Sequence, residues 1–236
     1  MKGMQVAAVI VAAGYGKRFN KFRKKQFLPL GGKPLLYWTL EVFQKVKQID
    51  GIILVLPRGD ISRQKKIIQK KFGKVKEIVP GGRLRQESVF NGLKKVGERF
   101  SLVAIHDGVR PLVSTGLIER TLRIAKKYGS AVTALLAKET VKLAKNKNII
   151  ERTLPREKIW LIQTPQVFPR EVLLKAYQKA QKDRFTATDD AQLVERLGYL
   201  VKLVPGEETN IKITTSEDLL FAETILSQRT QNTRKE

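Results

Sequence analysis

Two short segments of the sequence carry residue types suited to phosphate and metal chemistry. Gly14 and Gly16 follow the apolar run 5–12, and Asp107 closes the segment that begins with the apolar run 101–105. Glycines at the end of a parallel strand let the backbone approach a phosphate closely, and a lone carboxylate at the same sheet edge suits Mg²⁺. These residues predict a site for a phosphorylated ligand and a divalent cation.

The loop that contains the glycines is strongly basic. Residues 17–33 include seven Lys or Arg and no Asp or Glu. Basic groups around a glycine loop can hold a triphosphate and neutralise a departing pyrophosphate. The loop matches neither common phosphate motif: Phe19 replaces the third glycine of the dinucleotide fingerprint, and Pro34 stands where a P-loop needs Ser or Thr. The alternative interpretation, for most of these basic side chains, is that they are exposed to solvent in a surface loop and bind no phosphate.

Polar residues later in the chain supply further candidates. Gly82 and Ser88 lie in a segment that can present backbone and hydroxyl groups to a flat base, with a tight turn before a helix as the equal alternative. Lys212 lies between two isoleucines, so in a strand it is either an edge charge or an inward cation aimed at phosphate. We assign His106, the one histidine, to packing or loop support and not to catalysis.

The elements that would position these residues alternate along the chain. Apolar runs predict strands at 5–12, 51–56, 76–79, 101–105, 131–136 and 199–204. Helical periodicity predicts helices at 34–46, 60–72, 88–96, 117–128, 171–181, 189–197 and 216–226, followed by a frayed polar end. Such alternation is typical of an α/β domain with a mostly parallel sheet and helices on both faces. Residues 137–159 interrupt the pattern and predict a β-rich arm.

Composition excludes several classes of protein. The absence of cysteine excludes disulfide scaffolds, Cys-ligated metals and thiol nucleophiles. No apolar run approaches the roughly 18 residues of a membrane span, so we expect a cytoplasmic protein with no membrane partner. The 46 Lys and Arg exceed the 22 Asp and Glu, which gives a net charge of +24 and predicts a polyanionic ligand.

Taken in order, several segments resemble one protein family. They are AAGYGKRF, KKQFLPLGGKPLLYWTLEVF, PGGRLRQESVFNGL, IHDGVRP, KETVK, IWLIQTPQVF, TDDAQLVERLG and NIKIT. From about residue 6 to residue 226 the sequence is similar to the 2-C-methyl-D-erythritol 4-phosphate cytidylyltransferases of non-mevalonate isoprenoid biosynthesis. The resemblance implies one Rossmann-like nucleotidyltransferase domain over residues 1–236, whose β-arm at about 137–159 forms a homodimer. It also implies transfer of CMP from CTP to the methylerythritol phosphate with Mg²⁺ as cofactor, giving 4-diphosphocytidyl-2-C-methyl-D-erythritol and pyrophosphate.

The resemblance also implies roles for single residues. Cations near the reacting phosphates are Arg18, Lys25 and Lys212, and the Mg²⁺ ligand is Asp107. The nucleotide-binding positions are Ala12, Ala13, Gly14, Gly16, Gly82, Arg85, Ser88 and Asp107. The acceptor-binding positions are Arg110, Thr140, Arg156, Thr164, Thr188 and Asp189, some of them reached across the dimer. Arg83 departs from the family pattern, which often has an acidic residue there.

This chemistry explains which residue types are missing. A phosphate monoester has a second pKa of about 6, so at pH 7 it is largely a dianion. It can attack the α-phosphorus of CTP without a general base or a His, Cys or Ser nucleophile. An active edge rich in Lys and Arg is what such a direct in-line displacement requires.

Two alternatives stay open at this point. Ribitol-5-phosphate cytidylyltransferases share the glycine loop, the HDxxRP strand end and the QTPQ segment, although TDDAQLVE and SVFNGL favour the isoprenoid enzyme. The alternative from another class is a nucleic-acid-binding protein, which a charge of +24 would suit. Only 7% of residues are aromatic and no nucleic-acid motif is present, so we expect no nucleic-acid partner.

Overall fold

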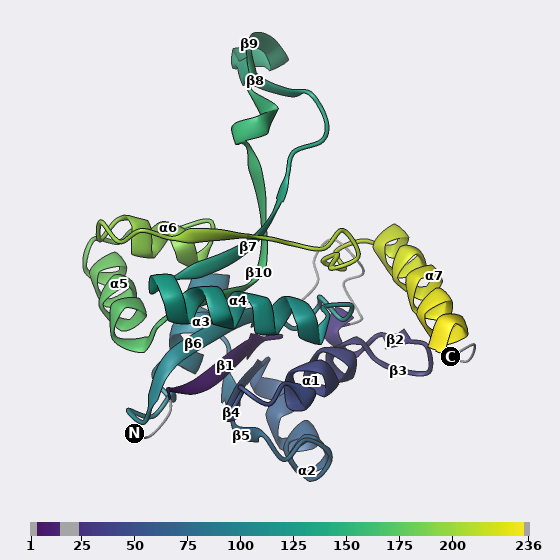
Figure 1. The fold of residues 1–236 in the computed structure, drawn as a ribbon. Helices are drawn as coiled ribbons and strands as arrows, with labels where there is room; N and C mark the ends of the chain where they lie inside the picture. The colour runs from purple at the N-terminus through teal and green to yellow at the C-terminus, as the bar shows by residue number, and fades with distance from the viewer. Residues whose placement is uncertain (1–3, 15–23, 234–236) are drawn as a thin grey trace.

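A seven-stranded sheet forms the body of the protein (Figure 1). The computed structural model describes residues 4–14 and 24–233. The strand order is β11-β7-β10-β6-β1-β4-β5, and every strand is parallel to the others except β10, which runs antiparallel to both of its neighbours. The strands are β1 (Gln5–Val11), β4 (Gly51–Leu56), β5 (Val75–Pro80), β6 (Phe100–Asp107), β7 (Ala131–Leu136), β10 (Trp160–Pro169) and β11 (Lys202–Pro205).

Helices cover both faces of this sheet. One apolar cluster joins the sheet to α1 (Leu35–Lys45), α2 (Ile61–Lys71) and α4 (Thr115–Tyr128). A second cluster joins the opposite face to α3 (Arg85–Leu93), α5 (Arg170–Lys182) and α6 (Asp190–Glu195). The last helix, α7 (Ser216–Thr233), packs against the small β2 (Pro29–Leu30) and β3 (Lys33–Pro34) pair. The described residues also form four short 3-10 helices: η1 (Lys25–Phe27), η2 (Arg58–Asp60), η3 (Asn146–Asn148) and η4 (Arg156–Lys158).

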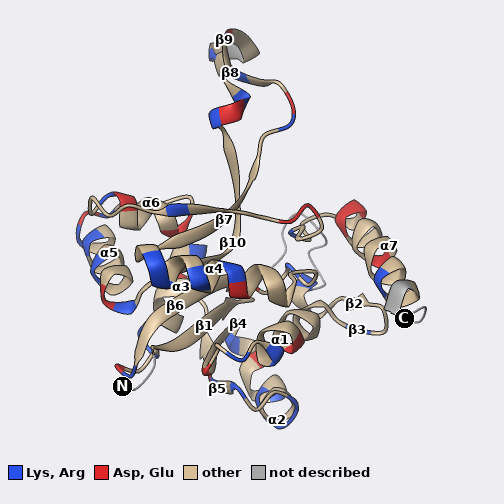
Figure 2. Ribbon diagram, in the orientation of Figure 1, with Lys and Arg blue, Asp and Glu red and all other residues tan. Residues whose placement is uncertain are grey.

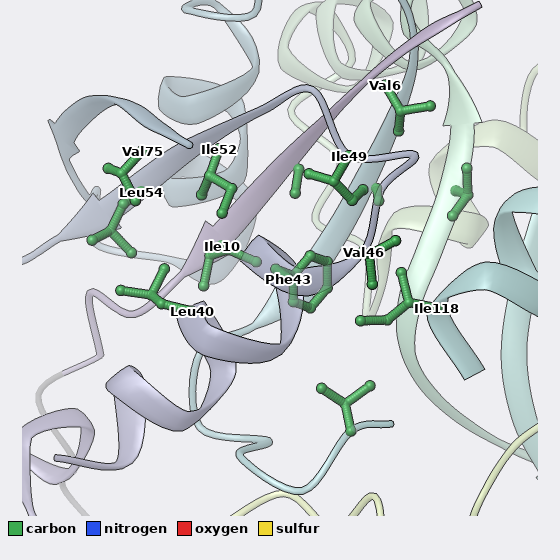
Figure 3. Close-up of a cluster of buried hydrophobic side chains, with 14 of the residues drawn as sticks. Val6, Ile10, Leu40, Phe43, Val46, Ile49, Ile52, Leu54, Val75 and Ile118 are labelled. Atoms are coloured by element: carbon green, nitrogen blue, oxygen red, sulfur yellow. The ribbon is translucent and has the colours of Figure 1, made fainter. Parts of the chain in front are cut away.

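The central strands are buried on both faces, which explains their continuous apolar sequence. Val6 and Ile10 of β1 point into the first cluster, which also contains Phe43 of α1 and Ile118 of α4 (Figure 3). Val9, the intervening residue, belongs to the second cluster. Because side chains alternate along a strand, one run of apolar residues serves two layers of helices. The predicted α/β architecture is confirmed.

Most elements lie within a few residues of the sequence prediction, and the largest differences are at α7 and β10. The strands predicted at 51–56 and 131–136 have those bounds in the structure. The frayed end expected after residue 226 is wrong as far as Thr233, because α7 continues to that residue, and residues 234–236 lie outside the described part of the chain. No strand was predicted across 163–168, yet this polar segment forms most of β10 and lies between two parallel strands. Hydrogen bonds to its buried polar side chains, described below, satisfy groups that would otherwise disfavour a central strand.

Residues 137–159 form an arm outside the main sheet, as predicted. In the arm β8 (Val141–Lys145) pairs only with the antiparallel β9 (Ile149–Leu154), and Figure 1 shows this hairpin projecting from the body. Ile149 and Ile150 are more than half exposed near its tip. After the arm the chain enters the main sheet as β10, which begins at Trp160.

The basic residues are spread over the molecule. Figure 2 shows Lys and Arg on several separate elements, among them α2, α4 and the arm.

Within residues 4–14 and 24–233, no helix is both long enough and apolar enough to cross a membrane.

Candidate active site

Three cations surround the carboxylate of Asp107 at the carboxyl end of β6. Arg85 Nε lies 3.0 Å from Asp107 Oδ1, and Lys212 Nζ lies 2.8 Å from Oδ2. Arg110 Nε lies 3.8 Å from the same Oδ2. The four residues come from α3, β6 and two loops, so the sheet edge gathers groups that are up to 127 positions apart in the sequence, from 85 to 212.

Asp107 is ionised because of these neighbours. Burial alone would raise the pKa of this carboxyl, but the charges of Arg85, Lys212 and Arg110 outweigh burial and hold the pKa well below its usual range. Burial has the opposite result at Arg110, where it lowers the guanidinium pKa. Asp107 therefore provides an ionised carboxylate within a cationic surrounding.

A second buried carboxylate holds Arg85 from its other side. Arg85 Nη2 donates to Asp190 Oδ2 at 2.9 Å, and the hydroxyl of Tyr177 donates to Asp190 Oδ1. Asp190 is fully buried at the first position of α6. Burial by itself lowers the pKa of Arg85, but the two carboxylates outweigh burial and raise this pKa well above the ordinary value. The guanidinium is thus fixed between Asp107 and Asp190.

Lys212 reaches Asp107 from a loop and not from a strand. The backbone N–H of Ile213 donates to the carbonyl of Val109 at 2.9 Å. Asn210 is fully buried and donates to the carbonyl of Thr164 and to the side chain of Gln163. These bonds tie the loop to β10 and aim Lys212 inward, which is the second of its two predicted orientations.

A cavity of about 390 Å³ opens beside Asp107 at the end of β1. Its lining includes the following residues predicted to bind nucleotide or reacting phosphates: Ala12, Ala13, Gly14, Lys25, Gly82, Arg85, Ser88, Asp107 and Lys212. Gly81, behind this wall, packs so closely on Ala13 that an added Cβ would lie 2.2 Å from the Cβ of Ala13. Ser88 Oγ accepts from the N–H of Gly82 at 3.0 Å, which fixes the glycine turn at the start of α3.

A second cavity of about 420 Å³ shares a wall with the first. Arg85, Asp107 and Lys212 line both cavities. The second is also lined by the predicted acceptor-binding residues Arg110, Thr164, Thr188 and Asp189. The carboxylate of Asp189 also caps α6, accepting from the N–H of Gln192 at 2.9 Å. Two ligands can thus meet at one carboxylate, each in its own cavity.

His106 is buried beneath the site and takes no part in its lining. Its ring lies 4.9 Å from that of Phe43, and Nδ1 lies 3.0 Å from Thr164 Oγ1. Nε2 faces the carbonyl of Arg110 at 3.4 Å and must donate to it, so Nδ1 accepts from the Thr164 hydroxyl, which in turn accepts the N–H of Asp107. Burial, partly countered by Asp107, lowers the His106 pKa from 6.5 to about 3. A neutral, enclosed imidazole agrees with the predicted packing role.

Two of the predicted residues that the structure describes do not join this cluster within the chain. Thr140 and Arg156 are exposed in the arm and line neither cavity. Arg156 Nη1 donates to the carbonyl of Lys138 at 2.7 Å, a contact inside the arm itself. Gly16 and Arg18 lie outside the described residues.

Comparison with known proteins gives the family. A family model described as 2-C-methyl-D-erythritol 4-phosphate cytidylyltransferase matches residues 6–228. The chain belongs to this family. A relative of that name from Syntrophus aciditrophicus (strain SB) is 45% identical, with 95% of this chain and 97% of the relative covered. One from Alkaliphilus oremlandii is 42% identical, with 95% and 96% covered.

Solved structures of this family share the fold. The 4-diphosphocytidyl-2C-methyl-D-erythritol synthase of Anaerococcus prevotii is 37% identical with a TM-score of 0.86, covering 95% of this chain and 97% of the other. The 2-C-methyl-D-erythritol 4-phosphate cytidylyltransferase of Thermus thermophilus is 36% identical with a TM-score of 0.77, covering 93% and 98%. These matches support the isoprenoid cytidylyltransferase and not the ribitol alternative.

Sequence reasoning missed three residues of this family member's site. Gln26 is buried in the first cavity wall, and its amide nitrogen has no hydrogen-bond partner among the described residues. Asp190 and Tyr177 complete the support of Arg85. The adjacent acids in TDDAQLVE were a signal for Asp190, but no local pattern connects Tyr177 to α3.

Proposed function

We propose that this chain transfers the cytidylyl group of CTP to 2-C-methyl-D-erythritol 4-phosphate, with release of pyrophosphate. The observation that carries the proposal is the shared wall of the two cavities, where Asp107, Arg85 and Lys212 face both. CTP occupies the cavity at the end of β1 and the acceptor occupies the cavity beside α6. The acceptor phosphate then meets the α-phosphorus at the shared wall.

In this mechanism the acceptor phosphate is itself the nucleophile. One of its oxygens attacks the α-phosphorus, and the bond to the bridging oxygen of the leaving pyrophosphate breaks. His106 cannot serve as the base because it is fully buried with a pKa of about 3. Lys25 and Lys212 line the nucleotide cavity, and in this mechanism they stabilise charge on the reacting phosphates. The family resemblance assigns the same role to Arg18.

The donor set fits Mg²⁺ held jointly with the substrate. Among the described residues, no group of three His, Cys, Asp or Glu side chains could bind a metal alone. Mg²⁺ commonly uses one or two carboxylates together with substrate phosphates, and Asp107 is an ionised carboxylate on the nucleotide cavity. Asp107 would therefore hold the ion, which when bound neutralises charge on the triphosphate.

We further propose that the chain acts as a homodimer through its arm. The hairpin has two exposed isoleucines, Ile149 and Ile150, and its strands find no partner beyond each other among the described residues. Thr140 and Arg156 lie on this arm, away from the cavities of their own chain, so they serve the acceptor cavity of the partner. The cytoplasmic location stays a prediction from the sequence.

The test measures pyrophosphate release from CTP and Mg²⁺ with each of two acceptors. Methylerythritol phosphate should support turnover, while ribitol 5-phosphate at the same concentration should give no release above the acceptor-free control. Equal or preferential use of ribitol 5-phosphate would overturn the assignment. Replacing CTP by ATP tests whether the base is selected in the same assay.

A further inference from the structure

The charge of Asp190 has no role in the chemistry described so far. Its side chain is fully buried and lines neither cavity, so it cannot contact substrate. Both of its oxygens are used, one by Arg85 and one by Tyr177. Burying a carboxylate in a protein is unfavourable unless it is paired, and the geometry gives it a cationic partner in Arg85.

Arg85 links this carboxylate to Asp107. The guanidinium donates from Nε to Asp107 and from Nη2 to Asp190, at 3.0 and 2.9 Å. Among the described residues, the ion-paired cluster contains Arg85, Arg110 and Lys212 against the two carboxylates, a net charge of +1. Without the charge at Asp190 the same cluster would carry +2, all of it around one carboxylate.

We propose that Asp190 is a positioning residue whose charge keeps Asp107 able to accept a dication. By sharing the charge of Arg85, it reduces the repulsion that a cation meets at Asp107. Asp190 also fixes the guanidinium on Oδ1 of Asp107. This leaves Oδ2, which pairs with Lys212, as the oxygen that can exchange the ammonium group for the metal ion. Tyr177 holds Asp190 in this position through its hydroxyl. The inference rests on the proposed use of CTP and Mg²⁺.

The expected effect separates charge from packing. In a site of effective dielectric constant about 20, a unit charge a few ångströms from a dication changes its affinity by at least about tenfold. Asp190→Asn makes the cluster more positive, so metal-free CTP should bind more tightly while Mg²⁺ improves that binding less. A merely structural defect would weaken CTP binding in both conditions.

The experiment measures the dissociation constant of CTP by calorimetry, once with EDTA and once with saturating Mg²⁺, and takes their ratio as the Mg²⁺ enhancement. No acceptor is present, so turnover plays no part. In Asp190→Asn the enhancement should fall at least about tenfold. Asp183→Asn is the matched control: it removes the same charge at the end of α5 from a residue that lines neither cavity, and should keep the parental ratio.

Two further variants make the test decisive. Arg85→Gln combined with Asp190→Asn returns the cluster to +1 and should restore the enhancement to within about threefold of the parent. Arg85→Gln alone removes one cation from the cluster and should give an enhancement at least equal to the parental one, which tests the idea even if Asp190→Asn does not fold. An unchanged ratio in Asp190→Asn, or no restoration in the double variant, would overturn the inference. Failure of the parent to bind CTP would instead refute the proposed function.

Discussion

The buried His106 should make the stability of this protein depend on pH in a range where few other groups titrate. It is the one histidine in the sequence, and its pKa is lowered from 6.5 to about 3 in the folded state. Below pH 6.5 this imidazole is mostly protonated in the unfolded chain, whereas in the folded chain it stays neutral until the pH approaches about 3. The free energy of unfolding therefore keeps its full value above that pH and declines as the pH falls toward about 3.

The size of the decline follows from the two pKa values. At pH 5 the unfolded state gains about 2 kcal/mol from protonation of this imidazole, and at pH 7 about 0.2 kcal/mol. Urea unfolding at the two pH values, in EDTA so that no metal binds at Asp107, should show a loss of about 2 kcal/mol. With a urea slope of roughly 1–3 kcal/mol per molar, the midpoint moves by about 1 M.

The matched variant is His106→Gln, which keeps an amide near the partners of the imidazole, Thr164 and the carbonyl of Arg110. This variant should be less stable at pH 7, since it disturbs a packed and hydrogen-bonded position. Between pH 7 and pH 5 its stability should hardly change. The reasoning is refuted if the parent keeps its free energy of unfolding at pH 5, or if the variant loses as much as the parent.

Three other predictions concern activity. Asp107→Asn should reduce turnover at least about 10²-fold while its circular dichroism spectrum stays unchanged, because the amide removes the anionic ligand; near-normal Mg²⁺-dependent turnover would contradict this. Lys25→Ala should lower kcat far more than Lys24→Ala, because Lys25 lines the nucleotide cavity and Lys24 pairs with an aspartate of η2. The loss of transition-state stabilisation in Lys25→Ala should be ~3–4 kcal/mol; equal small losses in kcat for both variants would mean a diffuse electrostatic effect. Mixing Arg156→Ala with Lys212→Ala chains should restore part of the activity, since one site of each mixed dimer is intact; full activity from a protein that sedimentation shows to be monomeric would rule out a shared site.

The sequence alone determined the α/β sheet and the edge that carries the site. Strands such as 51–56 are buried on both faces, so their apolar runs are continuous and their ends are sharp. Because the carboxyl ends of parallel strands share one edge, Asp107 and Gly14 could be placed together without any structure. The break in this alternation also located the arm at 137–159.

Only the tertiary structure decided how the polar residues are used. Gln163, Thr164 and Gln166 lie in a central strand whose sequence looks like a loop, because α6 and the loop before Lys212 supply their hydrogen bonds. Arg85 reaches a carboxylate 105 positions away, and no local pattern predicts that contact. Apolar burial depends on the periodicity of nearby residues, whereas a buried ion pair depends on which segments the fold brings within about 3 Å of each other.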